Sequence, residues 1–158
     1  MYEYLKILKN KNNFNPINIL DIGANVGEFS TTCKQHIWNS SNYYLIEGND
    51  NCKDKLLSTG FNILINLLSD EDNKDVIFYM TKDDIYCTGN SIYREKTKHY
   101  NDDRVIKEIK QTTKLDTLFN NKNLTFDLAK LDTQGSELDI LKGGVKTFSS
   151  CKYIIIEV

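Results

Sequence analysis

Short apolar runs alternate with amphipathic segments along most of the chain, a pattern typical of parallel strands joined by helices. The runs are rich in Ile, Leu and Tyr and too short for helices, so they predict buried strands. They lie at 17–22, 43–47, 61–68, 126–131 and 153–158. Apolar residues at helical spacing predict helices at 2–10, 26–37, 51–57, 115–119 and from Ser136 onward. The expected fold is α/β, with a Rossmann-like, doubly wound, mostly parallel sheet.

The middle of the chain departs from this alternation. Residues 76–80 form an apolar run that follows the third strand without room for a helix, which predicts a hairpin-like or edge strand. Residues 104–113 alternate weakly and predict a further strand. The long polar stretch between them, at 81–104, contains Tyr86, Tyr93, His99 and Tyr100. Such stretches in compact domains are usually functional or mobile, so an acceptor-binding role and a flexible surface insert both stay open.

Three local signals add detail. The first helix should cover a sheet edge with the face that carries Tyr4, Leu5 and Leu8. The lone tryptophan, Trp38, is expected to pack in the interior and not to bind a ligand. Ser136, followed three residues later by an acid, predicts a helix N-cap.

The first strand ends in a glycine turn. Asp21 is followed by Gly23 and Gly27, and a helical pattern starts directly after them. A strand, a glycine turn and a helix N-terminus can form a cofactor site, because glycine lets a ligand approach the backbone closely. Asn25 stands where the dinucleotide fingerprint needs a second glycine. Because Asp21 would repel a phosphate, the loop suits a ligand that carries an amino group.

Two later strands also end in polar residues, at the edge where open α/β sheets bind ligands. Glu47 closes the second strand and can accept hydrogen bonds from both hydroxyls of a ribose. Ser69 and Asp70 follow the third strand, where Asp70 can accept a hydrogen bond from the exocyclic amine of adenine. Two plainer interpretations stay open, with Glu47 capping the next helix and Asp70 lying in a solvated turn.

Composition limits the classes of function. The 158 residues fit one domain over 1–158, with an N-terminal helix and linker at 1–15. A net charge of −2 and a pI near 5.7 give no bulk attraction to nucleic acid, and no apolar run is long enough to span a membrane. The cysteines are too far apart for a zinc site and are expected to be free thiols in the cytoplasm. They are Cys33, Cys52, Cys87 and Cys151.

Five segments carry a pattern that extends over most of the chain. They are Asp21-Ile-Gly-Ala-Asn-Val-Gly27, Leu45-Ile-Glu-Gly48, Asn66-Leu-Leu-Ser-Asp70, Lys130-Leu-Asp-Thr-Gln-Gly-Ser-Glu137 and Ile155-Ile-Glu157. Together they resemble the FkbM-type methyltransferases over residues 17–158, and the fourth segment is the most specific. The resemblance implies a class I methyltransferase fold. It further implies an enzyme that uses S-adenosylmethionine, releases S-adenosylhomocysteine and methylates a hydroxyl of a sugar or glycoconjugate.

The resemblance also implies roles for single residues. It puts Asp132 beside the methyl-donating centre, as a base or as a metal ligand, although nothing else in the sequence indicates a metal. The implied cofactor-binding residues are Asp21, Gly23, Asn25, Gly27, Glu47, Ser69, Asp70, Asp132 and Gln134. Candidates for acceptor binding are Asn90, Ser91, Tyr93 and Glu137. Apart from the resemblance, His99 in the polar stretch is the second candidate base.

One arrangement is expected from these assignments. The carboxylates of Asp21, Glu47 and Asp132 should gather at one rim of the sheet, free of ion pairs with lysines, and hold a cationic nucleoside.

The chain departs from the family pattern in two places. Gly48 stands where many relatives have proline, and glycine loosens that turn because it restricts the backbone less than proline does. The last two strands of the superfamily sheet are missing after Glu157, so the fifth strand is expected to be an exposed edge. A truncated chain, or a second copy that covers the edge, would explain this.

Two other functions stay open. One is a cofactor-binding module that needs a partner and has little or no turnover. The other is a nicotinamide-dependent Rossmann enzyme, against which Asn25 and Asp21 count.

Overall fold

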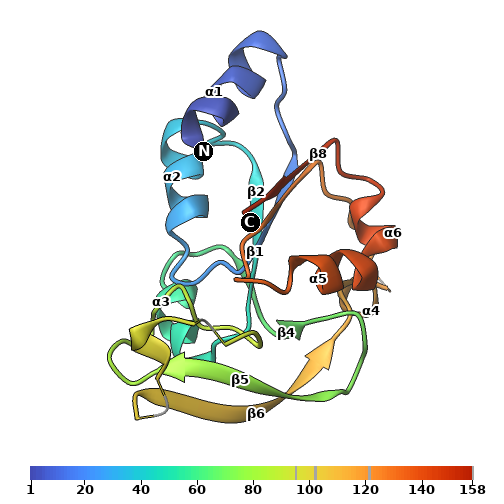
Figure 1. Cartoon of the computed structure of the whole chain (residues 1–158). Helices are drawn as coiled ribbons and strands as arrows, with labels where there is room; N and C mark the ends of the chain where they lie inside the picture. Colours follow the sequence, from blue (N-terminus) through green and yellow to red (C-terminus); the bar gives the residue numbers. More distant parts are fainter. Residues whose placement is uncertain (95, 102, 121, 158) are drawn as a thin grey trace.

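Five parallel strands form the central sheet of the computed structural model, in the order β3-β2-β1-β7-β8 (Figure 1). The structure describes residues 1–94, 96–101, 103–120 and 122–157. The strands are β1 (Asn18–Ile22), β2 (Asn42–Glu47), β3 (Asn62–Ile65), β7 (Leu128–Leu131) and β8 (Tyr153–Ile156). This confirms the predicted Rossmann-like α/β class, because β1 lies centrally and pairs in parallel with both β2 and β7.

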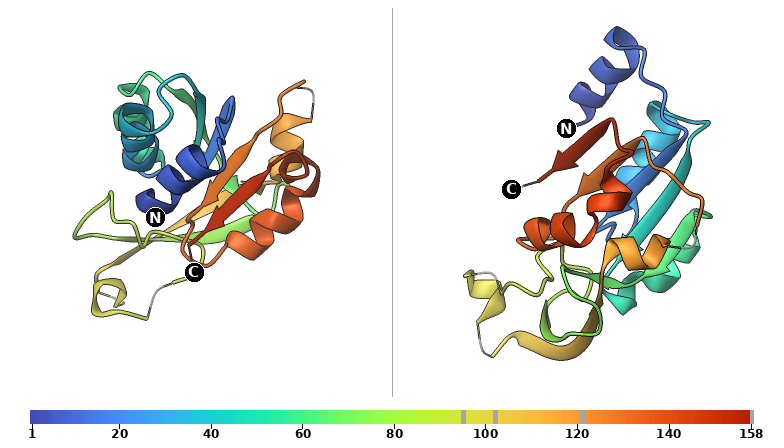
Figure 2. Two further views of the ribbon diagram at one scale, coloured as in Figure 1. Left: turned by 90° about the horizontal axis from the view of Figure 1, so that it is seen from above. Right: turned by 90° about the vertical axis from the view of Figure 1, so that its right-hand side faces the viewer.

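Helices cover both faces of this sheet (Figure 2). One face packs against α1 (Tyr2–Lys11), α2 (Glu28–His36) and α3 (Lys53–Leu57), and the other against α4 (Leu115–Phe119), α5 (Glu137–Gly143) and α6 (Val145–Phe148). The alternation along β1 explains the two layers, since Ile19 joins the first core cluster and Leu20 the second. Two short 3-10 turns, Asp50–Cys52 and Lys98–Tyr100, complete the helical elements.

A second, three-stranded sheet lies beyond the carboxyl end of β3. It contains β4 (Leu67–Leu68), β5 (Asp75–Thr81) and β6 (Val105–Thr113), with β6 between the other two. The prediction of one strand at 61–68 was wrong, because the chain turns at Asn66 and its last two residues pair with β6 instead of β2. The predicted hairpin-like strand at 76–80 is confirmed as β5, which runs antiparallel to β6.

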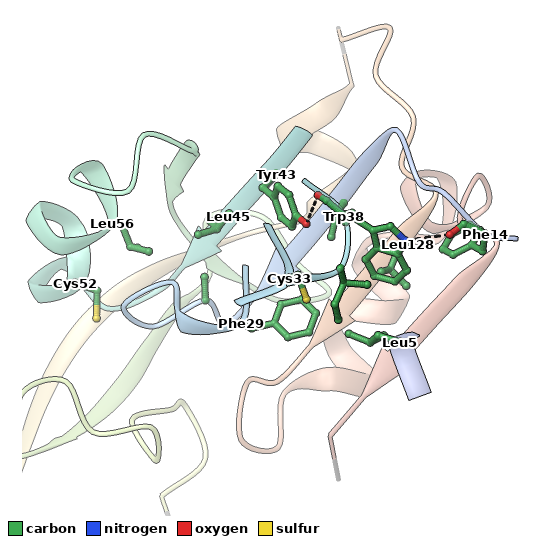
Figure 3. Close-up of a cluster of buried hydrophobic side chains, with 13 residues drawn as sticks. Leu5, Phe14, Phe29, Cys33, Trp38, Tyr43, Leu45, Cys52, Leu56 and Leu128 are labelled. Carbon is green, nitrogen blue, oxygen red and sulfur yellow. Dashed lines mark hydrogen bonds between the residues drawn. The ribbon is translucent and has the colours of Figure 1, made fainter. Parts of the chain in front are cut away.

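The first core cluster is closed by aromatic residues at the amino ends of the strands (Figure 3). Trp38 is 3% exposed, and its indole Nε1 donates a hydrogen bond to the carbonyl oxygen of Phe14 over 3.0 Å. The hydroxyl of Tyr43 donates to the carbonyl oxygen of Trp38 over 2.9 Å. Trp38 therefore packs, as predicted. In α1, Leu5 is buried as expected, but Tyr4 is 73% exposed. Tyr4 was therefore wrongly included in the predicted buried face of this helix.

The fifth strand, β8, pairs with β7 and ends the order of the sheet, as expected for an edge. Three residues of the predicted segments lie outside the described residues, namely Val158 of the predicted strand at 153–158 and Glu95 and Asp102 of the polar stretch. Within the described part of the chain, no helix combines the length and apolar character needed to cross a bilayer.

Candidate functional site

A pocket lies at the rim of the sheet where the carboxyl ends of β1, β2 and β7 meet. The space between its walls, including space open to solvent, is about 650 Å³. Its walls come from the strand ends, β4, the start of α5 and the polar stretch after β5. Of the residues predicted from sequence, the pocket is lined by Gly23, Asn25, Glu47, Asn90, Ser91 and Asp132.

Glu47 presents a carboxylate that backbone N–H groups hold at the pocket wall. Its Oε2 accepts a hydrogen bond from the backbone N–H of Asn25, and its Oε1 accepts one from the backbone N–H of Asn49, each over 2.8 Å. The two oxygens of a carboxylate offer about four lone-pair sites, so the group can still accept a hydrogen bond from a ligand in the pocket. Burial raises the pKa of Glu47, and the backbone N–H groups of Asn49, Asn25 and Gly48 partly offset that rise.

Asp21 lies at the same rim but not on the pocket wall. It is fully buried on the face covered by α2, where the hydroxyl of Ser30 donates to its Oδ2 over 2.6 Å. Its Oδ1 lies 3.5 Å from the ammonium group of Lys130, which stands directly across from it on β7, and accepts no hydrogen bond. Burial raises the pKa of Asp21, and Lys130 and Ser30 offset part of the rise. The expectation of carboxylates without lysine partners is therefore wrong for Asp21, and it is wrong for Asp132 as well.

Asp132 shares the same lysine. Its Oδ2 lies 3.1 Å from the ammonium group of Lys130, and its Oδ1 accepts a hydrogen bond from the side-chain amide of Gln134 over 3.0 Å. Burial alone would lower the pKa of Lys130, but the two carboxylates outweigh it and hold that pKa above its usual value. The cluster thus sets two carboxyl groups, of Asp21 and Asp132, against the one ammonium group of Lys130, and Asp132 is its member on the pocket wall.

Glycine is needed at position 23 because the backbone at the end of β7 packs directly against it. It has a φ of +73°, and a Cβ atom there would lie 1.9 Å from the carbonyl oxygen of Asp132. The backbone at the end of β7 therefore leaves no room for a side chain at this position. The sequence analysis had expected a ligand to make this close approach. Gly27, with a φ of +84°, precedes α2, and Asn25 between them also has a positive φ, of 50°.

The turn after β7 is held by an acid. The carboxylate of Glu137 accepts hydrogen bonds from the backbone N–H groups of Thr133 and Gly135 over 2.8 and 3.0 Å. Glu137 therefore shapes the backbone of the turn, and acceptor binding by this residue stays a prediction. Ser136 is the N-cap residue of α5, but its side chain makes no capping bond, and its hydroxyl donates instead to the carbonyl oxygen of Thr133.

The predicted acceptor residues of the polar stretch dock onto this turn. The hydroxyl of Ser91 lies 3.0 and 2.9 Å from the carbonyl oxygens of Thr133 and Gln134. The hydroxyl of Tyr93 donates to Asp139 over 2.7 Å, and this bond raises the pKa of Tyr93. The structure thus brings residues of the polar stretch beside the loop that carries Asp132, although Tyr93 itself lies outside the pocket wall and is 50% exposed.

Ser69, Asp70 and His99 are further predicted site residues that lie away from the pocket wall, as do Gly27, Gln134 and Glu137. Ser69 and Asp70 follow β4, and the hydroxyl of Ser69 lies 3.2 Å from the carboxylate of Asp70. His99 lies on the surface, with its Nδ1 3.9 Å from the carboxylate of Asp83 and more than half of its side chain exposed.

Two residues that the sequence analysis did not single out contribute to the pocket. Phe78 of β5 is 2% exposed and adds an aromatic side chain to an apolar wall shared with Ile46, Leu68 and Ile140. Asn49 is 2% exposed and holds Glu47. Asn49 could have been found as the polar residue that starts a helical turn after a strand-end acid, whereas the place of Phe78 depends on the pairing of β5 with β6.

No group of three or more His, Cys, Asp or Glu side chains in the described ranges is arranged to hold a metal ion.

Comparison with known proteins gives one result. The model of the Methyltransferase FkbM domain matches residues 21–158. No curated protein and no solved structure matches the chain.

Proposed function

The chain belongs to the FkbM methyltransferase family, and we propose that it transfers a methyl group from S-adenosylmethionine to a hydroxyl of a sugar or glycoconjugate. The observation that carries the proposal is the carboxylate of Glu47 in the strand-end pocket. Its two oxygens accept hydrogen bonds from the backbone N–H groups of Asn25 and Asn49, Gly48 contributes a third backbone N–H, and the residue lines the pocket. A vicinal diol such as that of a ribose matches two adjacent acceptor atoms.

The rest of the pocket fits the other parts of this cofactor. Phe78, Leu68 and Ile140 supply an apolar wall for a flat purine ring. The carboxylate of Asp132 suits the ammonium group or the sulfonium centre of the cofactor. When bound, the cofactor supplies an electrophilic methyl group on a sulfonium centre.

The residues of this chain would orient the acceptor and accept its proton. Alignment of reacting groups can supply roughly 7–11 kcal/mol of barrier reduction, so a positioned pocket accounts for much of the rate. Asp132 is the base that we propose, because it lines the pocket and its carboxylate is fixed by Lys130 and Gln134. His99, the second candidate from the sequence, is supported less, because it does not line the pocket.

The acceptor class is inferred from the family and from the polar segment that lines the pocket. Thr88, Asn90 and Ser91 offer hydroxyl and amide groups, which suit the hydrogen-bonding pattern of a sugar. The free cysteines agree with a reducing compartment, so we include the cytoplasm in the proposal. The proposal also includes a second copy of the chain that covers the exposed edge of β8.

Calorimetric titration tests the first half of this proposal. The wild-type protein should bind S-adenosylhomocysteine with saturable heat, and Glu47→Gln should bind it at least roughly tenfold more weakly. Absence of saturable heat at millimolar ligand would contradict the proposal. The second half needs a transfer assay over a panel of sugars and glycosides. Binding without release of S-adenosylhomocysteine would favour the alternative function of a binding module without turnover.

A further inference from the structure

The segment Ile85–Ser91, which we call the strap, forms one side of the pocket. Cys87, Thr88, Asn90 and Ser91 of the strap all line it. Figure 1 shows this part of the chain, in yellow-green beyond β5, lying beside α3. The strap contains no helix or strand of its own, apart from an isolated bridge between Ser91 and Tyr79. Its position must therefore depend on side-chain contacts with the rest of the protein.

Two of these contacts come from the residues that hold Glu47. The side-chain amide of Asn25 donates a hydrogen bond to the carbonyl oxygen of Tyr86 over 2.8 Å. The side-chain amide of Asn49 donates to the carbonyl oxygen of Ile85 over 2.6 Å. The backbone N–H groups of the same two asparagines donate to the two oxygens of Glu47. Each asparagine therefore connects Glu47, through one residue, to the strap.

The geometry of both asparagines suits this double role. Asn25 sits in the left-handed region with a φ of 50°, which turns its N–H toward β2 and is a conformation that asparagine tolerates well. Asn49 is 2% exposed, and its side-chain oxygen accepts the backbone N–H of Asn51, which fixes the orientation of the amide. A third contact holds the strap from α3, where the ammonium group of Lys55 lies 3.4 Å from the centre of the Tyr86 ring.

We propose that Asn25 and Asn49 are positioning residues that couple the filling of the pocket at Glu47 to the closing of the strap. This inference rests on the proposed function, in which Glu47 binds the ribose of the cofactor. A ligand on Glu47 fixes the carboxylate, and with it the two backbone segments whose side chains hold the strap. The coupling must be reciprocal, so the ligand shifts the strap toward closing by the same factor by which closing of the strap raises the affinity for the ligand.

Three single substitutions each remove one of the three contacts that hold the strap. Asn25→Gly keeps the left-handed backbone and removes the bond to Tyr86. Asn49→Ser keeps an oxygen that can cap Asn51 and removes the bond to Ile85. Lys55→Met removes only the contact with the Tyr86 ring and touches neither Glu47 nor the pocket wall. Asn62→Ser is the matched control, because it removes a side-chain amide bond to the carbonyl oxygen of Tyr43 at the opposite end of the sheet.

Hydrogen–deuterium exchange of a peptide that covers the strap is measured without ligand and with saturating S-adenosylhomocysteine. In the wild-type protein, the ligand should slow exchange of the strap. In the three variants, exchange without ligand should rise roughly tenfold for each bond lost. Affinity by calorimetry should fall as well, by no more than the factor by which the ligand favours the closed strap in the wild-type protein. Asn62→Ser should match the wild-type protein in both measurements. Lys55→Met is the most informative variant, because Lys55 contacts the strap and does not line the pocket.

The outcomes that overturn the inference differ from those that overturn the proposed function. If wild-type protein binds the ligand but strap exchange is unchanged, or if Lys55→Met loosens the strap without weakening the ligand, the coupling is absent. If strap exchange without ligand is equal in all variants, the asparagines do not hold the strap. If the wild-type protein binds no ligand although the variants loosen the strap, the proposed function fails, and the coupling fails with it. A thermal melt of each variant shows whether it is folded.

Discussion

Asp21 and Lys130 form a buried ion pair between the two central strands, with 3.5 Å between Oδ1 and Nζ. Asp21 is fully buried and the side chain of Lys130 is 6% exposed, so neither charge is hydrated to any large extent. A buried pair of this kind is weak evidence for added stability, but removing one partner leaves the other charge uncompensated.

Replacing the lysine should therefore be costly. We expect Lys130→Met to lower the free energy of unfolding by roughly 3–5 kcal/mol near neutral pH, measured by urea denaturation. The double variant Lys130→Met, Asp21→Asn should regain most of this loss, because it removes the uncompensated carboxylate. Equal stability of the single and double variants would show that Asp21 is not charged in the variant.

The same pair predicts a pH dependence of stability. The folded protein already holds the pKa of Asp21 above its usual value of 3.8, and loss of Lys130 should raise it further. The folded state then binds a proton that the unfolded state has released, so the free energy of unfolding falls as pH rises. Its contribution is fully present below about pH 4 and is lost as pH passes the raised pKa. Denaturation of Lys130→Met between pH 4 and pH 8 should show this slope, and the double variant should lack it.

The contact between the ends of β1 and β7 should not tolerate a side chain. Gly23→Ala would place a Cβ atom 1.9 Å from the carbonyl oxygen of Asp132 at a φ of +73°, and we expect a loss of roughly 2–5 kcal/mol. Gly60→Ala is the matched control, since its φ is +75° but no atom lies within 4 Å of the added Cβ. The control should lose only roughly 1–2 kcal/mol from backbone strain. Similar losses for the two variants would refute the steric argument.

Substitutions of Glu47 and Asp70, two acids at strand ends, should differ in their effect on cofactor affinity. Glu47→Gln removes the negative charge at the proposed ribose site and should weaken S-adenosylhomocysteine by roughly 10- to 100-fold in calorimetry. Asp70→Asn should have an effect below about twofold, because Asp70 does not line the pocket. A large effect of Asp70→Asn would instead support the adenine contact predicted from the sequence.

The identity of the base can be tested by rate measurements. We expect Asp132→Asn to lower kcat by roughly 10²- to 10⁴-fold. His99→Gln should leave kcat nearly unchanged, because His99 contacts Asp83 at the surface. Loss of activity in His99→Gln with retained cofactor affinity would reverse this assignment.

The central sheet could be predicted because its strands are apolar runs that end in glycine or acid. Residues 17–22 and 126–131 show the pattern, and the structure places β1 and β7 within them. The place of β4 in the second sheet could not be predicted, since no local signal shows that Leu67 and Leu68 leave the line of β3 to pair with β6. Pairing between segments more than forty residues apart depends on the whole fold.

The residues around the candidate site were predictable to a similar extent. The turns at Gly23 and Glu47 were found from spacing, and both reach the pocket. The ion pair of Lys130 was missed, although a lysine within the apolar run Leu128–Leu131 is a visible signal that a carboxylate lies on the neighbouring strand. Phe78 and the docking of the strap were missed because they depend on tertiary contacts.

The location of Trp38 has a practical consequence. It is the single tryptophan of the chain, and it packs beside Tyr43 at the start of β2, whereas the pocket lies at Glu47, roughly 13 Å further along the strand. Its intrinsic fluorescence should change when the core opens and stay constant when the pocket is filled. Denaturation followed by this emission therefore reports folding alone, and a shift of its midpoint on addition of a ligand measures binding without a label.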